Sequence, residues 1–124
     1  QCQLQLWLGV MTRDEFLASV AIASRPPEPE DLRHAPLLND WWVSLEDRFL
    51  HLHGDVEDHP VLGSQHITTS PLLAFDEPER WARTASRWYR LGGTWRGMAP
   101  EERRAAGHSL KDGLRQLRAQ LRGH

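Results

Sequence analysis

Apolar side chains recur at helical spacing in the stretch that follows Thr12. The recurring positions are Phe16, Leu17, Val20 and Ala21. Spacings of three and four place such residues on one face of a helix. Thr12 followed by Glu15 is also a capping-box signature. The pattern predicts a first helix over residues 12–24.

Three prolines within residues 26–29 end this helix, because proline lacks a backbone donor and pushes the preceding residue toward extended conformations. Residues 25–30 are expected to form a stiff linker, followed by a short helical turn around Glu30 to His34. Before the first helix, apolar and polar residues alternate over positions 1–10. That period of two predicts an edge strand, with a leader segment as the alternative.

The stretch from Pro36 to Gly54 carries a mixed signal. The spacing of its apolar residues suits a helix that begins at Asn39 or Asp40. Those residues are Trp41, Trp42, Leu45, Phe49 and Leu52. The letters FLHLH at 49–53 alternate instead, as they do in a strand. We predict a helix first and a strand after it.

Three segments with strand-like composition are separated by turn residues. They are FLHLHGDV (49–56), HITTSPLLAF (66–75) and RWARTASRWYRL (80–91). β-Branched and aromatic residues or alternation mark each of them, so a three-stranded antiparallel β-meander is expected. The last segment also fits a helix with Trp81 and Trp88 on one face, and its periodicity leaves both structures open.

A C-terminal helix is predicted from Pro100 onward, because proline and glutamate are typical of a first helical turn. Its apolar stripe is Leu110, Leu114, Leu117 and Leu121. Glycine costs a helix about 1 kcal/mol, so a break or kink near Gly107 or Gly113 is an open alternative. The leucines are expected to pack on the protein's own sheet. The predicted fold is a single α+β domain over residues 11–124, in which a helix precedes the β-meander and another follows it.

The composition fits one compact soluble domain. The chain has 124 residues, 40% of them apolar, and a mean hydropathy of -0.59. No apolar run approaches the roughly 20 residues that a bilayer crossing needs, so we expect no membrane partner. Cys2 has no second cysteine to pair with. Nothing therefore calls for an oxidising compartment, and a cytoplasmic protein is expected.

Charge is divided unevenly along the chain, although the formal net charge is only -2. Residues 1–79 hold 4 basic and 14 acidic side chains, and residues 80–124 hold 11 basic and 3 acidic ones. The two parts therefore carry opposite charge. Such a chain can neutralise itself on folding, form a homodimer, or offer either face to a partner of opposite charge.

Basic and aromatic residues are interleaved in the last predicted strand, and a basic stripe accompanies the C-terminal leucines. The candidate partner-binding residues are Trp81, Arg83, Arg87, Trp88 and Arg90, with Arg115, Arg118 and Arg122 as a second patch. Arginine and tryptophan dominate binding hot spots, and a protein partner is expected. The same chemistry suits nucleic acid, in which guanidinium groups meet phosphates and aromatic rings stack on bases.

Histidines offer a candidate metal site. His51 and His53 lie two apart, which puts both on one face of a strand, and His59 follows. Zinc needs three or four converging ligands, whereas solvent-facing strand histidines account for the spacing without a metal. We predict no metal or cofactor, and name His51, His53 and His59 as the ligands if one is bound.

Motifs of enzymes are missing from the chain. No nucleophile elbow surrounds its serines, and LGG at 91–93 lacks the residues that complete a phosphate-binding loop. Cys2 has no basic neighbour that would activate its thiol. We therefore predict that the protein is not an enzyme and has no catalytic residues.

A block of short motifs spans residues 30–92. The motifs are APLL at 35–38, Trp41, His59 with Pro60, ITTSPLL at 67–73 and WARTASRWYRLG at 81–92. This block resembles a family of short uncharacterised proteins from alphaproteobacteria and their phages or prophages. The resemblance implies a strand pair there, which favours strand over helix at 80–91. It also implies a small accessory protein of mobile elements.

These observations predict a small non-enzymatic binding protein. Given the resemblance, the concrete expectation is an anti-CRISPR-like or similar counter-defence factor that inhibits or modulates a host protein machine by occlusion. The alternative is a small nucleic-acid-binding regulator that uses the basic C-terminal half of the chain.

Overall fold

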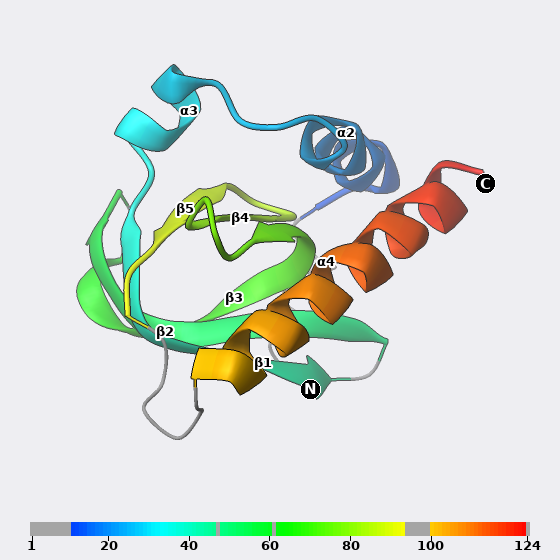
Figure 1. Ribbon diagram of the computed structural model, residues 1–124. Coiled ribbons are helices and arrows are strands. Elements are labelled where there is room, and N and C mark those ends of the chain that lie inside the picture. Colours follow the sequence, from blue (N-terminus) through cyan, green and yellow to red (C-terminus); the bar gives the residue numbers. More distant parts are fainter. Residues whose placement is uncertain (1–10, 47, 61, 94–99, 124) are drawn as a thin grey trace.

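The computed structural model describes residues 11–46, 48–60, 62–93 and 100–123. The described residues form three helices and five strands, and the strands close into a barrel in the order β1-β2-β3-β4-β5 (Figure 1). The helices are α2 (Arg13–Ala23), α3 (Pro29–Arg33) and α4 (Pro100–Arg122). The strands are β1 (Leu37–Glu46), β2 (Phe49–His59), β3 (Gly63–Asp76), β4 (Trp81–Thr84) and β5 (Trp88–Leu91).

This architecture is α+β, and the helices predicted before and after the sheet in the sequence are both present. The sheet itself corrects the prediction, because five strands form a closed barrel in place of a three-stranded meander. The predicted edge strand or leader at residues 1–10 lies outside the described residues. None of the described helices is both long enough and apolar enough to cross a membrane.

The two N-terminal helices begin where their capping residues predict. Thr12 Oγ1 accepts a hydrogen bond from Glu15 N at 3.0 Å, and Glu15 Oε1 accepts one from Thr12 N at 2.8 Å. After the proline-rich linker, α3 begins with the same reciprocal arrangement between Glu28 and Asp31. The first helix and the short helical turn are both confirmed.

Residues 37–46 form β1, so the predicted helix in this stretch is wrong. Asp40 has a φ of 50°, and the register with β2 shifts at this point. A bulge adds one residue to a strand and interrupts its alternation. Because of the bulge, Leu38, Trp41 and Val43 all reach the same core. Trp42 and Leu45, which contributed to the helical spacing, are instead exposed, at 40% and 68%.

The third predicted strand is in fact two strands joined by a turn. β4 pairs antiparallel with β3 and β5, and β5 pairs in parallel with β1. Arg90 N donates to Pro36 O at 2.9 Å, and Gly92 N donates to Leu38 O at 2.8 Å. This parallel seam closes the barrel, and closure removes the sheet edges that would otherwise pair with other chains. Strand structure at residues 80–91 is therefore confirmed.

Two apolar clusters hold the barrel and helices together. The main cluster combines residues from all five strands with Leu114 of α4: Leu38, Trp41, Leu52, Val56, Ile67, Leu72, Phe75, Ala82, Tyr89, Leu91 and Leu114. The second joins α2 to β3 and the β4–β5 turn through Val20, Ala23, Leu73, Ala74 and Ala85. β3 contributes to both clusters because a register shift after Leu72 changes which side chains face the barrel interior.

α4 is one continuous helix that lies across the outside of the barrel and reaches α2 (Figure 1). Gly107 and Gly113 do not interrupt it. Leu114 is 1% exposed, and Leu110 and Leu117 pack beside it on the main cluster. The prediction that the leucine stripe packs on the protein's own sheet is confirmed.

We expect Leu114→Ala to lower the free energy of unfolding by about 3 kcal/mol, since removal of a buried leucine leaves a cavity that neighbours fill only in part. Gln116→Ala, at an exposed position on the same helix, should change it by less than about 0.5 kcal/mol. Urea unfolding monitored by tryptophan fluorescence measures both. Equal effects of the two substitutions would show that α4 is not part of the cooperative domain.

Candidate functional site

The turn between β4 and β5 is built around the buried hydroxyl of Thr84. Its Oγ1 accepts hydrogen bonds from the backbone N of Ser86 at 3.2 Å and of Arg87 at 3.3 Å. From α2, Ser19 Oγ donates to Ala85 O at 2.6 Å. Because the turn is held from inside and from α2, the side chains that follow it have defined positions.

A cluster of arginine and tryptophan side chains lies between this turn and the linker after α2. Trp88 and Arg83 are 7% and 8% exposed, and the Arg83 guanidinium lies 5.5 Å from the Trp88 ring centroid. The Arg25 guanidinium lies 6.0 Å from the same ring and pairs with Asp31 at 3.3 Å. Guanidinium groups are attracted to the face of an indole ring. The cluster therefore ties the linker after α2 to β4 and β5.

Arg83 is committed to the interior of the fold. Its Nε donates to Thr84 O at 2.9 Å, and its Nη2 lies 3.5 Å from Ser19 Oγ. Burial lowers the pKa of Arg83, the Asp31 carboxylate opposes this effect, and the nearby guanidinium groups of Arg25 and Arg87 add to it. The local environment thus holds more positive than negative charge.

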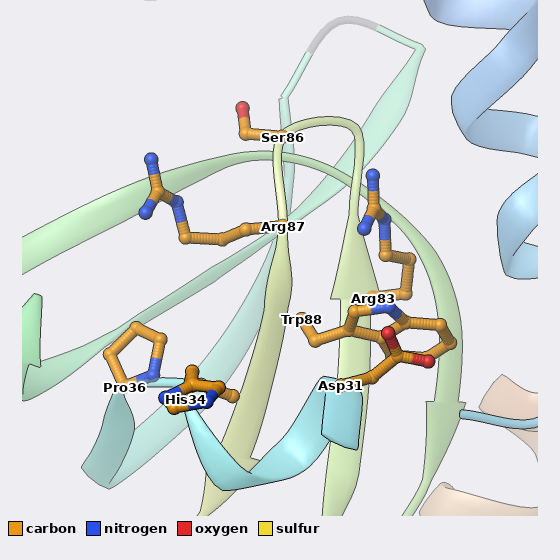
Figure 2. Close-up of a pocket in the computed structure, with 8 residues that line it drawn as sticks. Asp31, His34, Pro36, Arg83, Ser86, Arg87 and Trp88 are labelled. Carbon is orange, nitrogen blue, oxygen red and sulfur yellow. The ribbon is translucent and has the colours of Figure 1, made fainter. Parts of the chain in front are cut away.

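An open pocket of about 190 Å³ lies between the end of α3 and the β4–β5 turn. Its lining residues are Asp31, His34, Ala35, Pro36, Arg83, Ser86, Arg87 and Trp88. Figure 2 shows Arg83 and Arg87 extending on opposite sides of the turn, with Arg87 on the side of His34 and Pro36. Polar groups therefore surround a floor that Pro36 and Trp88 make apolar.

Arg87 differs from its neighbours in being uncommitted. Its guanidinium makes no hydrogen bond or ion pair with any residue that the structure describes, and its side chain is partly exposed. Ser86 beside it is exposed, and Ser86 Oγ lies 2.8 Å from Ser70 Oγ. A guanidinium and a hydroxyl are thus presented together at the mouth of the pocket.

Three other predicted partner-binding residues are partly buried by contacts within the chain. Trp81 packs against the second apolar cluster. Arg90 Nε donates to Ala35 O at 2.8 Å, and Arg118 Nη1 donates to Leu73 O at 2.7 Å. Burial also lowers the pKa of Arg118. These side chains fasten α3 and α4 to the barrel.

The remaining two lie on the exposed side of α4. Arg115 Nη1 pairs with Asp112 Oδ1 at 3.2 Å, and the Arg115 side chain is 63% exposed. Arg122 is exposed and has no hydrogen-bond or ion-pair partner within the described ranges. The eight candidates therefore do not form one surface: Arg87 belongs to the pocket, and Arg115 and Arg122 belong to α4.

The strand histidines are buried, contrary to the solvent-facing interpretation. His51 is 4% and His53 is 8% exposed. The His53 ring stacks on Trp42 at 3.9 Å between centroids, its Nε2 lies 2.6 Å from Ser44 Oγ, and its Nδ1 lies 3.0 Å from Thr68 Oγ1. Both ring nitrogens therefore meet hydroxyl groups.

His51 and His59 have separate surroundings. His51 Nδ1 donates to Thr69 O at 2.8 Å, and its buried Nε2 has no hydrogen-bond partner among the described residues. His59 Nδ1 accepts from Leu62 N at 3.0 Å, and its ring lies 6.3 Å from that of Tyr89. Across the residues placed by the structure, no three His, Cys, Asp or Glu side chains come together as a metal site.

Burial shifts several pKa values in this half of the barrel. It lowers the pKa of His53, with the Glu46 carboxylate opposing the effect, and it lowers the pKa of His59, to which the Arg87 charge adds. It raises the pKa of Tyr89 to about 12. Both histidines are therefore held in the neutral form near neutral pH.

Sequence reasoning missed the α3 side of the pocket, which Asp31, His34 and Pro36 provide. The local signals were present, since Glu28 and Asp31 have capping-box spacing and Pro36 precedes the first strand. Their position beside the β4–β5 turn depends on the parallel pairing of β1 with β5. No local sequence pattern predicts a pairing between strands so far apart in the chain. Trp42, which is not among the candidate residues, is 40% exposed.

Comparison with known protein families identifies a match. The model of a protein family described as a family of unknown function (DUF6634) matches residues 8–111. No curated protein and no solved structure matches the chain.

We expect the two arginines that flank the turn to differ in their effect on stability. Arg83→Gln should lower the free energy of unfolding by about 1–3 kcal/mol, because it removes charged hydrogen bonds from a buried site. Arg87→Gln should stay within about 0.5 kcal/mol of the wild type. Urea unfolding of the two variants tests this, and similar losses for both would mean that Arg87 is also a structural residue.

The free energy of unfolding should decrease as the pH falls below about 6.5, the ordinary pKa of histidine in an unfolded chain. His53 and His59 have lowered pKa values in the folded protein. The unfolded chain therefore takes up protons first, and stability rises with pH across this window. Urea unfolding between about pH 5 and pH 8 measures the slope.

His53→Gln should make that slope shallower. His108→Gln is the matched control, because the His108 side chain is 80% exposed on α4. A slope that His53→Gln leaves unchanged would mean that the His53 ring does not titrate with folding.

Proposed function

The chain belongs to the family of unknown function DUF6634, and we propose that it acts as a small binding protein whose pocket at Arg87 receives an acidic side chain of a partner protein. The observation that carries this proposal is the uncommitted guanidinium of Arg87. Arg25, Arg83 and Arg90 around it all have partners within the chain. Arginine forms two parallel hydrogen bonds with a carboxylate, which gives both strength and orientation.

The charge around the pocket supports an anionic ligand. The charges of Arg25 and Arg87 both act on Arg83, and Asp31 is the carboxylate among the lining residues. Like charges held together in partly buried surroundings raise the free energy of the unoccupied site. A second carboxylate, supplied by a partner, would relieve this repulsion. Functional sites often hold charged groups in such unfavourable surroundings.

The size of the pocket supports a side chain of a macromolecule over a free cofactor. Its volume of about 190 Å³ is below the roughly 300–1,000 Å³ typical of small-molecule sites. Pro36 and Trp88 supply an apolar floor, and Ser86 and His34 supply polar groups around it. An apolar centre with a polar rim is the usual composition of a protein interface. The ligand is therefore best described as an aspartate or glutamate that a partner inserts.

We further propose that this partner is part of a host protein machine, which the chain would inhibit or modulate as an anti-CRISPR-like or similar counter-defence factor. The support for this role is the resemblance of residues 30–92 to short phage and prophage proteins. Its mechanism would be occlusion, with the body of the barrel covering the partner surface around the acidic residue.

The binding experiment uses a fluorescein-labelled hexaglutamate peptide as the acidic probe, with fluorescence anisotropy as the readout. Arg87→Gln should weaken binding at least about tenfold, as loss of one partner of a desolvated charge pair does. Arg33→Gln is the matched control, because Arg33 is an exposed arginine of α3 that pairs with Glu30 at 3.1 Å. It removes the same charge and should change the affinity less than about twofold.

Two results would contradict the pocket. One is equal loss of affinity in the two variants, and the other is no binding of the peptide by the wild type at low salt. The proposed host partner is tested separately, by capture from host lysate with wild-type and Arg87→Gln proteins as paired baits. A host protein that only the wild type retains supports the role, and identical sets of retained proteins oppose it.

A further inference from the structure

α4 carries a line of basic side chains that the pocket does not involve. The line consists of Arg104, His108, Lys111, Arg115, Arg118 and Arg122, at successive spacings of four, three, four, three and four. Residues three or four apart lie next to one another on a helix surface. The line is therefore a continuous stripe, about 27 Å long at 1.5 Å per residue.

Two members of this stripe fix the helix to the barrel. Lys111 Nζ pairs with Asp76 Oδ2 at 2.8 Å, and Arg118 Nη1 donates to Leu73 O at 2.7 Å. These contacts hold the stripe in one orientation relative to β3. The remaining members are thus displayed on a rigid support.

Most of the other side chains are available to a partner. Arg104 and Arg122 are exposed, and neither makes a hydrogen bond or ion pair with a residue in the described part of the chain. Arg115 pairs with Asp112, but the two side chains are 63% and 44% exposed. Such exposed pairs contribute about 0–1 kcal/mol, so Arg115 can exchange this partner for a stronger one.

We propose that this stripe binds the phosphate backbone of double-stranded nucleic acid without reading its sequence. Folded protein surfaces normally intersperse charges of both signs. Along this stripe four arginines and one lysine stand against Asp112, which pairs with His108 and Arg115. A straight row of fixed cations complements a rigid polyanion whose charges repeat at regular intervals. Contacts to phosphates position a protein on the duplex and carry no direct sequence information.

The composition of α4 favours a duplex over a single strand. Proteins that bind single strands stack the bases on aromatic side chains. The segment Pro100–Arg122 contains no aromatic residue. Trp88, whose ring could otherwise stack on a base, is buried under Arg25 and Arg83. An acidic protein surface is the competing partner, and the experiment includes it.

The test measures anisotropy of a fluorescein-labelled DNA duplex of mixed sequence with the full-length protein at 50, 100 and 200 mM salt. The stripe variant is Arg115→Gln with Arg122→Gln, and both positions are exposed, so the fold should persist. The control variant is Arg33→Gln with Arg48→Gln, two exposed arginines outside α4. Circular dichroism and urea unfolding verify that both variants are folded.

We expect the wild type to bind the duplex with an affinity that falls steeply with salt. The stripe variant should bind at least about tenfold more weakly at 50 mM salt. Its slope of log affinity against log salt concentration should be smaller by about 1.8, because it loses two phosphate contacts. The control variant should keep the wild-type slope. A second duplex of unrelated sequence should bind equally well.

Four outcomes would overturn the proposal. Three of them are no duplex binding at 50 mM salt, equal losses in the stripe and control variants, and a loss of polyglutamate binding in the stripe variant as large as its loss of duplex binding. The last would assign the stripe to acidic protein surfaces. A labelled single strand that binds more tightly than the duplex would also contradict it.

Discussion

The parallel seam between β1 and β5 is the constraint on which the rest of the structure depends. It consists of a short backbone pairing, reinforced by Arg90, whose backbone N bonds Pro36 O and whose Nε bonds Ala35 O. Because the seam begins where α3 ends, it brings His34 and Pro36 next to the turn that precedes β5. The contacts that close the barrel therefore also bring the two sides of the pocket together.

The arginine residues around the β4–β5 turn have different roles because their side chains lie on different sides of it (Figure 2). Arg83 and Arg90 are held by other parts of the chain. Arg87 lies in the turn itself and extends on the side of His34 and Pro36, and its charge acts on His59 and Tyr89. The arginines that stabilise the fold thus surround the turn that carries Arg87, whose own guanidinium has no hydrogen bond or ion pair among the described residues.

The parts of the fold predicted from the sequence were those with local causes. The capping box at Thr12, the proline-rich linker and the leucines of α4 each determine an element through neighbours in the chain. β1 was misread because the exposed apolar residues Trp42 and Leu45 complete a helical spacing with Trp41, and because the bulge at Asp40 interrupts the alternation of a strand. Of the candidate site, the sequence indicated Arg87 but not its setting, since pairing between the first and last strands leaves no local pattern. Burial of Arg83 and Trp88 depends likewise on contacts with distant parts of the chain, here α2 and the linker after it.

The uneven charge along the chain is in part a division in space. Exposed acidic residues lie on β1 and β2 at Asp40, Asp55 and Glu57, and the basic stripe occupies α4, where Asp76 pairs with Lys111 and Asp112 pairs with Arg115. An uneven arrangement of charge orients a protein as it approaches a charged partner, even when its net charge is small. A net charge of -2 therefore does not argue against polyanion binding, because the helix would meet the phosphates while the acidic strands stay in solvent. The pocket contains Arg87 and the stripe lies on α4, so the two proposed binding sites share no basic residue and both can be occupied.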